Sequence, residues 1–190
     1  MMNSTAHDGL TGEFAIRHAV EADAAALSGF AAHVFAETFA PDNAPLDMQA
    51  YLSDAFTPEK QAAEIADPTC VCLLADVGGS MAGYALLRLG AAAPHVPAKY
   101  VTQYPVELQR FYVAHAWHGT GVAWRLMAAC MEIAQARGGA MIWLGVWERN
   151  ARAIRFYEKQ GFTDIGTQPF QLGSDLQTDR VMARSVGDRD

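Results

Sequence analysis

The chain is poor in cysteine, has no excess of positive charge and contains no long apolar run. Only 3 of its 190 residues are cysteines, at Cys70, Cys72 and Cys130. This spacing suits neither a disulfide framework nor a metal-binding or redox motif. We therefore expect reduced thiols that serve as small apolar side chains, as in a cytoplasmic protein.

The charge balance and the hydropathy pattern exclude two further classes of protein. With 14 basic and 21 acidic residues the formal net charge is −7, which argues against a general nucleic-acid-binding protein. No apolar run reaches membrane-spanning length, and residues 1–12 lack the basic-then-apolar order of a signal peptide. We interpret residues 1–12 as a loose tail and residues 13–187 as a single domain with neither a nucleic-acid nor a membrane partner.

Strand and helix patterns follow one another along the chain without an internal repeat. Strands are expected at residues 14–18, 70–77, 81–89, 108–113 and 141–147. Helices are expected after the capping residue Asp23, over residues 46–56, between Thr57 and Asp67, and over residues 122–137. Gly78 and Gly79 predict a hairpin turn, and residues 90–104 are expected to form a loop.

The most informative segment is the glycine turn at residues 118–123, with the sequence His-Gly-Thr-Gly-Val-Ala. It lies between an expected strand and an expected long helix. The first turn of a helix leaves backbone N–H groups without partners and carries partial positive charge, and glycines let a phosphate approach closely. Strand, turn, helix and following strand form a βαβ unit, which places ligands at the carboxyl ends of its strands. These features predict a pyrophosphate site.

Together with other segments, this turn makes the chain resemble the GNAT acetyltransferase superfamily. The matching residues are 111–113, 118–123 and 143–147, Asn150, and Phe156-Tyr157 with Gly161-Phe162. Gly121 and Ala123 match the family's turn, whereas His118 stands where the family has Arg or Gln. The resemblance implies an α/β (α+β) fold, in which helices flank a mixed, mostly antiparallel sheet and a parallel strand pair splays at the cofactor cleft.

The resemblance also implies acetyl-CoA as co-substrate and no metal. The backbone of residues 111–113 would pair with the pantetheine arm, the turn would hold the pyrophosphate, and Asn150 would lie near the arm. The implied cofactor-binding residues are Phe111, Tyr112, Val113, His118, Gly119, Thr120, Gly121, Val122, Ala123, Asn150 and Tyr157.

The implied reaction is direct transfer of the acetyl group to a primary amine, without a covalent enzyme intermediate. Tyr157 matches the family's acid, because a phenol with a pKa near ~10 still carries its proton at neutral pH. In polyamine-type relatives a glutamate on strand four often acts as the base, but the aligned residue here is Gln109, which cannot accept a proton. Glu107 lies two residues earlier on the same strand face and is the candidate base.

Residues 170–179 resemble the C-terminal segment of bacterial enzymes related to polyamine acetyltransferases. A polyamine would need carboxylates for its second ammonium group, because an unpaired charge in a cleft is costly. The candidate substrate-binding residues are Glu37, Gln109 and Asp175. The expected partner is therefore a small amine or polyamine, and a homodimer stays open.

Two alternative functions also stay open: a non-catalytic CoA-binding regulatory module and a protein amino-terminal acetyltransferase. A metal site at His115 and His118 is not expected, because no third ligand accompanies the pair. The four tryptophans are expected in the core or in pocket walls rather than on a base-stacking surface; they are Trp117, Trp124, Trp143 and Trp147.

Overall fold

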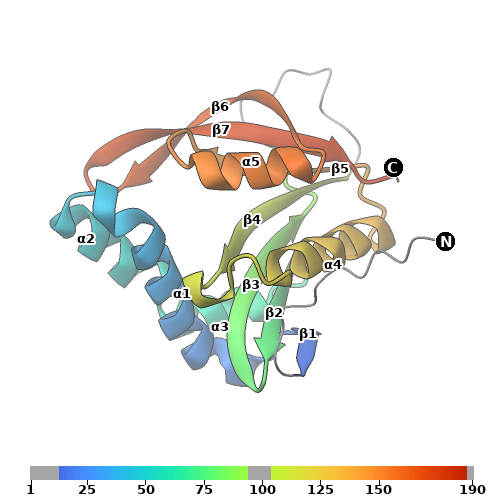
Figure 1. Cartoon of the computed structure of the whole chain (residues 1–190), viewed down its shortest axis with the longest axis horizontal. Helices are drawn as coiled ribbons and strands as arrows, with labels where there is room; N and C mark the ends of the chain where they lie inside the picture. Colours follow the sequence, from blue (N-terminus) through green and yellow to red (C-terminus); the bar gives the residue numbers. More distant parts are fainter. Residues whose placement is uncertain (1–12, 94–103, 188–190) are drawn as a thin grey trace.

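The protein is built around one seven-stranded sheet with helices on both faces (Figure 1). A computed structural model describes residues 13–93 and 104–187. The expected N-terminal tail, residues 1–12, and most of the expected loop at residues 90–104 lie outside this part of the chain.

The strand order is β1-β2-β3-β4-β5-β7-β6. All neighbouring strands are antiparallel except β4 and β5, which are parallel. This arrangement confirms the predicted mixed, mostly antiparallel sheet. The strands are β1 Phe14–His18, β2 Cys70–Val77, β3 Ser80–Leu89, β4 Pro105–Val113, β5 Met141–Trp147, β6 Thr163–Leu172 and β7 Asp175–Ser185.

The helices cover the sheet as two separate layers, each with its own apolar core. Residues of α1, α2 and α3 pack on one face, whereas α4 and α5 pack on the other. The helices are α1 Ala24–Phe39, α2 Pro45–Ala55, α3 Pro58–Ala66, α4 Val122–Ala136 and α5 Ala151–Lys159. In α4 the fully buried Val122, Leu126 and Cys130 follow one another at four-residue spacing, as the sequence pattern predicts.

Two predicted helix caps have different outcomes. The Thr57 hydroxyl accepts a hydrogen bond from the Lys60 amide at 3.2 Å and caps α3. The prediction that Asp23 caps α1 is wrong, because the backbone is already helical there, in the 3₁₀ turn Glu21–Asp23. The Asp23 carboxylate instead accepts the Val20 amide at 2.8 Å and pairs with Arg17.

The parallel pair β4 and β5 stays together over only three residues of each strand. Pairing begins with Pro105 opposite Met141 and ends with Glu107 opposite Trp143. Beyond these residues β4 and β5 do not pair. In β4 a bulge lies at Gln109, since Leu86 and Leu87 of β3 face Arg110 and Leu108. Bulges bend the strand that contains them, so β4 turns away from β5 and the predicted splay is confirmed.

The hairpin of β6 and β7 completes the sheet beside β5. Strand β7 runs antiparallel to both neighbours, and its register brings Asp179 opposite Trp147 of β5 and Gln168 of β6. The sequence pattern did not predict these two strands. The hairpin lies on the side of β5 away from β4.

The remaining expectations about the core are mostly confirmed. All three cysteines are free and buried. Trp143 and Trp147 are buried, but Trp124 is 53% exposed on α4, so its predicted burial is wrong. Among the helices of residues 13–93 and 104–187, none is long and apolar enough to cross a bilayer.

Candidate active site

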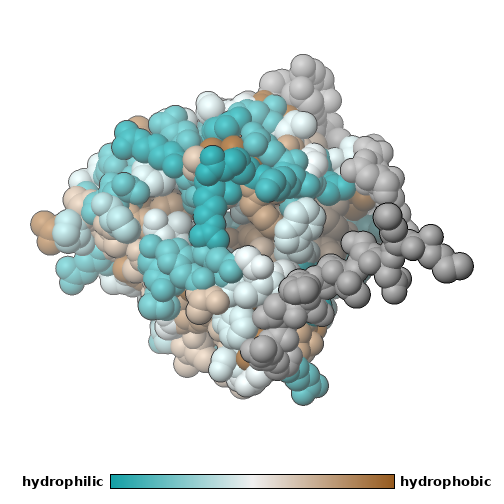
Figure 2. Space-filling model, in the orientation of Figure 1, coloured by the Kyte–Doolittle hydropathy of each residue, from teal (hydrophilic) through white to brown (hydrophobic). Residues whose placement is uncertain are grey.

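A cavity of about 580 Å³ lies where β4 and β5 diverge. Its walls come from α1, β4, β5, α5 and the β6–β7 hairpin. Figure 2 shows hydrophilic side chains over α5 and apolar ones in the depth between α5 and α4. The splay therefore brings ten of the predicted site residues to one cavity: Glu37, Glu107, Gln109, Phe111, Tyr112, Val113, His118, Ala123, Asn150 and Tyr157.

The glycine turn has the backbone shape expected of an anion site. Gly119 and Gly121 have φ angles of 79° and 94°, in the left-handed region that favours glycine. The first intrahelical bond of α4 runs from the Arg125 amide to the Gly121 carbonyl, 3.1 Å apart. The amides of the preceding residues in this first turn, which include Val122 and Ala123, therefore come before the helical ladder and remain suited to an anion.

His118 is a neutral side chain that fixes the position of the turn, and it does not act as a cation. Its Nε2 lies 2.7 Å from the Val113 carbonyl and joins the turn to the end of β4. Burial lowers the pKa of His118 below its ordinary value. The replacement of the family's Arg or Gln by His118 thus leaves anion binding to backbone N–H groups.

Tyr157 is held in place by aromatic neighbours. Its ring makes edge contacts with Phe111, Phe156 and Phe162 at centroid distances of 6.3, 5.5 and 5.7 Å. The helix α5 that carries it is capped by Asn150, whose side chain accepts the Ala153 amide at 3.1 Å. Burial raises the pKa of the Tyr157 phenol, so the phenol keeps its proton at neutral pH.

Comparison with known proteins assigns the fold to a family. The model of the Acetyltransferase (GNAT) family matches residues 35–162. The chain belongs to the GNAT acetyltransferase family. An uncharacterized N-acetyltransferase of Mycobacterium tuberculosis is 34% identical over 164 residues, which cover 86% of this chain and 98% of that protein. Another, from Lactobacillus delbrueckii subsp. lactis, is 32% identical over 80% of this chain and 86% of its own length. This GNAT protein is thus an N-acetyltransferase.

Solved structures show the same fold at lower sequence identity. The PaiA N-acetyltransferase of Thermoplasma acidophilum, in complex with coenzyme A, superposes with a TM-score of 0.74 at 20% identity, over 91% of this chain and 99% of that one. An acetyltransferase structure from Salmonella typhimurium with its cofactor acetyl-CoA has a TM-score of 0.61 at 23% identity, over 94% and 96% of the two chains. The GNAT fold with its parallel β4–β5 pair is thereby confirmed.

Carboxylates also line the cavity. Glu37, on α1, lies 3.4 Å from His33 through Oε1, while its buried Oε2 has no hydrogen-bond partner. Burial raises the pKa of Glu107, and the charge of Arg88 on β3 acts against that rise. The predicted Asp175 is not brought to this cavity, because it is exposed at the start of β7 and accepts a hydrogen bond from Gln177.

Sequence reasoning missed a third cavity carboxylate, Asp179, which is only 8% exposed. Burial alone raises its pKa to about 6. A Cβ at Gly145 would lie 3.0 Å from Asp179 Oδ2 and 2.5 Å from Gln168 Nε2, so the missing side chain makes room for both groups. The sequence offered one indication of this site, because Gly145 is a glycine within a strand of otherwise bulky residues. Only the pairing of β5, β6 and β7 shows that Gln168 and Asp179 lie next to it.

No group of three metal-ligating side chains occurs within the described part of the chain. The rings of His115 and His118 are tilted relative to each other, with centroids 4.7 Å apart, beside the glycine turn.

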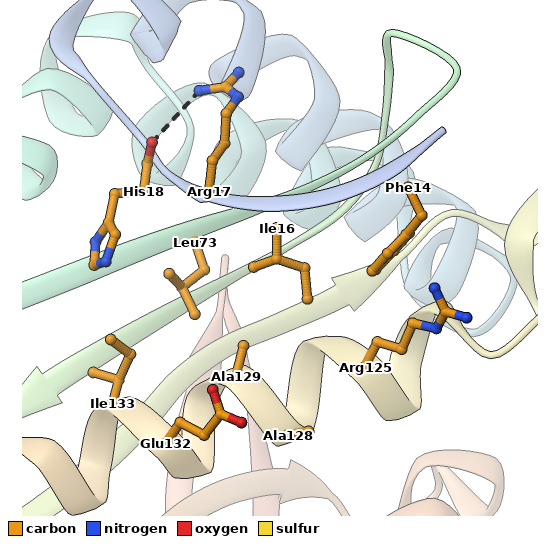
Figure 3. Close-up of a pocket in the computed structure, with 10 residues that line it drawn as sticks. All are labelled: Phe14, Ile16, Arg17, His18, Leu73, Arg125, Ala128, Ala129, Glu132 and Ile133. Carbon is orange, nitrogen blue, oxygen red and sulfur yellow. Dashed lines mark hydrogen bonds between the residues drawn. The ribbon is translucent and has the colours of Figure 1, made fainter. Parts of the chain in front are cut away.

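A second hollow, of about 470 Å³, lies between β1 and α4 (Figure 3). Its walls are mostly apolar and include Ile16 and Ile133. The guanidinium of Arg17 at its edge is already paired with Asp23 and Asp76. The hollow shares no lining residue with the cavity at the splay.

Proposed function

We propose that this GNAT protein transfers an acetyl group from acetyl-CoA to a primary amine of a small cationic acceptor, with polyamines favoured. The observation that carries the proposal is a single cavity that adjoins the glycine turn and is lined by three carboxylates. These carboxylates are Glu37, Glu107 and Asp179. The complexes of two structural neighbours with CoA or acetyl-CoA support the choice of donor.

The residues around the splay suit acetyl-CoA. The free edge of β4 at residues 111–113 offers backbone groups to the pantetheine arm, because β5 no longer pairs with β4 there. The N–H groups at residues 118–123 suit the pyrophosphate, and Asn150 would lie near the arm. Acetyl-CoA, when bound, supplies the acetyl group as a thioester.

Two proton transfers accompany this reaction, and side chains of the protein carry out both. The acceptor nitrogen forms a bond to the acetyl carbon while the carbon–sulfur bond breaks, so nitrogen must lose a proton and sulfur must gain one. Tyr157 holds the proton for the sulfur. A carboxylate of the cavity takes the proton from nitrogen, and Glu107 is the candidate from the sequence.

Release of CoA from acetyl-CoA tests this function. We would compare spermidine, a monoamine and a peptide with a free amino terminus, using a thiol reagent to follow CoA. We expect spermidine to be the best acceptor, since its additional ammonium groups meet the extra carboxylates of the cavity. Turnover on the peptide alone would indicate a protein amino-terminal acetyltransferase. Acetyl-CoA binding without turnover on any acceptor would indicate a regulatory module.

A further inference from the structure

Asp179 is a buried carboxylate that faces the cavity without a cation. No hydrogen bond or ion pair to its carboxylate occurs within residues 13–93 and 104–187, although it is only 8% exposed. The adjacent Arg180 pairs with Asp164 at 2.6 Å instead. A buried carboxylate of this kind is costly, and a cationic ligand would offset that cost.

The charged groups around Asp179 leave its charge uncompensated. Tyr51 of α2 and Tyr112 of β4 are its electrostatic neighbours, and burial raises the pKa of both phenols, so both are neutral. Two arginines line the cavity. Arg110 of β4 is paired with Glu64 at 2.5 Å, and Arg152 of α5 acts on His118 beside the glycine turn.

Further hydrogen-bond acceptors of the same cavity have no donor. Gln168 Oε1 and Glu37 Oε2 are both buried, and neither has a hydrogen-bond partner among the residues that the structure describes. Gln168 Nε2 and Asp179 Oδ2 both approach the space above Gly145, so the side-chain amide of Gln168, which also carries the unpartnered Oε1, lies close to Asp179. An ammonium group has three donors and no acceptor, so it matches this surplus of acceptors.

We propose that Asp179 binds the acceptor amine and removes its proton, with the Oε1 of Gln168 as a second acceptor that orients the amine. The proton passes from the ammonium nitrogen to an Asp179 carboxylate oxygen, and the freed lone pair forms the bond to the acetyl carbon. This inference rests on the proposed acetyl transfer to an amine.

The positions of Tyr157 and Asp179 relative to the sheet support their assignment as proton donor and proton acceptor. Tyr157 belongs to the core on the α4–α5 face, whereas Asp179 interacts with Tyr51 and Tyr112, which pack on the α1–α2 face. The splay of β4 from β5 is the opening between the faces. Proton donor and proton acceptor therefore reach the reacting atoms from opposite sides.

Glu107 suits this role less well than Asp179. It lies opposite Arg88 in the β3–β4 register, and that charge lowers its pKa against the effect of burial. Asp179 has a pKa near 6 with no opposing cation, which is close to the working pH that favours a general base. Glu107 and Glu37 then remain for the second ammonium of a polyamine.

A pH series on the full-length protein with acetyl-CoA and spermidine tests the assignment. We expect wild-type kcat/KM for spermidine to rise with pH through about 6, where Asp179 of the free protein loses its proton, and then to level off. In Asp179→Asn this inflection should disappear, and turnover near neutral pH should fall by roughly 10²-fold. Acetyl-CoA affinity, measured by calorimetry, should match wild type. The control Glu59→Gln, an exposed carboxylate on α3, should leave the profile unchanged.

The outcomes separate this assignment from the proposed function. A wild type that acetylates no amine defeats the proposed function itself. An active wild type whose Asp179→Asn variant keeps the inflection and the turnover overturns the role of Asp179. If Asp179→Asn does not fold, Asp179→Glu decides, because it retains a base and should keep a shifted inflection. A wild-type profile without any inflection near 6 also overturns the assignment.

Discussion

At the scale of single residues, burial raises two pKa values on opposite sides of the splay, with different chemical results. The phenol of Tyr157 starts from an ordinary pKa near ~10, so any rise keeps it protonated. The carboxylate of Asp179 starts near ~4, so a rise to about 6 brings it close to neutral pH without protonating it there. Desolvation thus favours an acid at one position and a base at the other.

Tyr157→Phe removes one oxygen and preserves the ring that packs against Phe111 and Phe162. We expect turnover to fall by ~10²-fold, because proton donation to the leaving sulfur is lost. The affinity for acetyl-CoA and the melting temperature should stay near wild type. Steady-state kinetics and calorimetry measure the two effects, and wild-type turnover in the variant would limit Tyr157 to a packing role.

Asp179→Asn should stabilise the folded protein near neutral pH. The folded-state pKa of about 6 lies above the ordinary value of 3.8, so the charged form is less favourable in the folded than in the unfolded state. Wild-type stability therefore falls as the pH rises from about 4 to about 6, and the cost is fully present above that range.

Urea unfolding of wild type and Asp179→Asn near pH 7 and near pH 4 measures this cost. We expect the variant to be more stable by about 1–3 kcal/mol at the higher pH and the difference to vanish at the lower pH. A variant that is less stable at neutral pH would mean that the charged carboxylate has a favourable partner in the fold.

At the scale of elements, the glycine turn and the first turn of α4 act as one unit. Gly121 has φ of 94°, and nothing lies within 4 Å of the position where its Cβ would be. A side chain at this residue would therefore meet no protein atom. It would instead strain the turn and occupy the space in front of the amides.

Gly121→Val should weaken acetyl-CoA binding by at least tenfold, about 1.4 kcal/mol, because a branched side chain covers the anion site. The matched control is Gly78→Val in the β2–β3 hairpin, where φ is 57° and nothing lies within 4 Å. Both variants should lose stability, since both positions are left-handed. Only Gly121→Val should lose affinity in a calorimetric titration, and equal affinity in the two variants would refute the cofactor site.

At the scale of the whole molecule, the net charge and the carboxylates of the cavity would both attract a cationic acceptor. The net charge is −7, and three carboxylates line one cavity. A surface and a cavity of the same sign concentrate oppositely charged substrates, and salt weakens this effect.

Glu37→Gln should raise the KM for spermidine several-fold and leave kcat nearly unchanged, because the residue is expected to bind the second ammonium. A monoamine has no second ammonium, so its KM should not change. Glu107→Gln, assayed in the same series, should likewise raise the KM for spermidine, because Asp179 is assigned the role of base. A loss of turnover near neutral pH that alkali partly restores would instead identify Glu107 as the base. Equal use of spermidine and the monoamine by all three proteins would exclude a polyamine acceptor.

Much of the order of helices and strands could be predicted because it depends on local sequence patterns. The buried stripe of α4, the cap at Thr57 and the Gly78-Gly79 hairpin depend on neighbours within a few residues. Asp23 was mispredicted as a cap, since the preceding 3₁₀ turn places its carboxylate near Arg17. Trp124 was predicted to be buried, although its neighbours on α4 leave it exposed.

The sequence by itself determined the strand–turn–helix that offers backbone N–H groups to an anion, because glycine conformation and helix ends are local properties. It also determined the family, through the residues around Gly121 and Tyr157. Only the tertiary structure decided which carboxylates share the cavity. Asp179 faces it because β7 lies beside β5, whereas Asp175, four residues earlier, remains in solvent. Strand pairing joins residues distant in sequence, and burial, which sets the pKa of a carboxylate, exists only after that pairing forms.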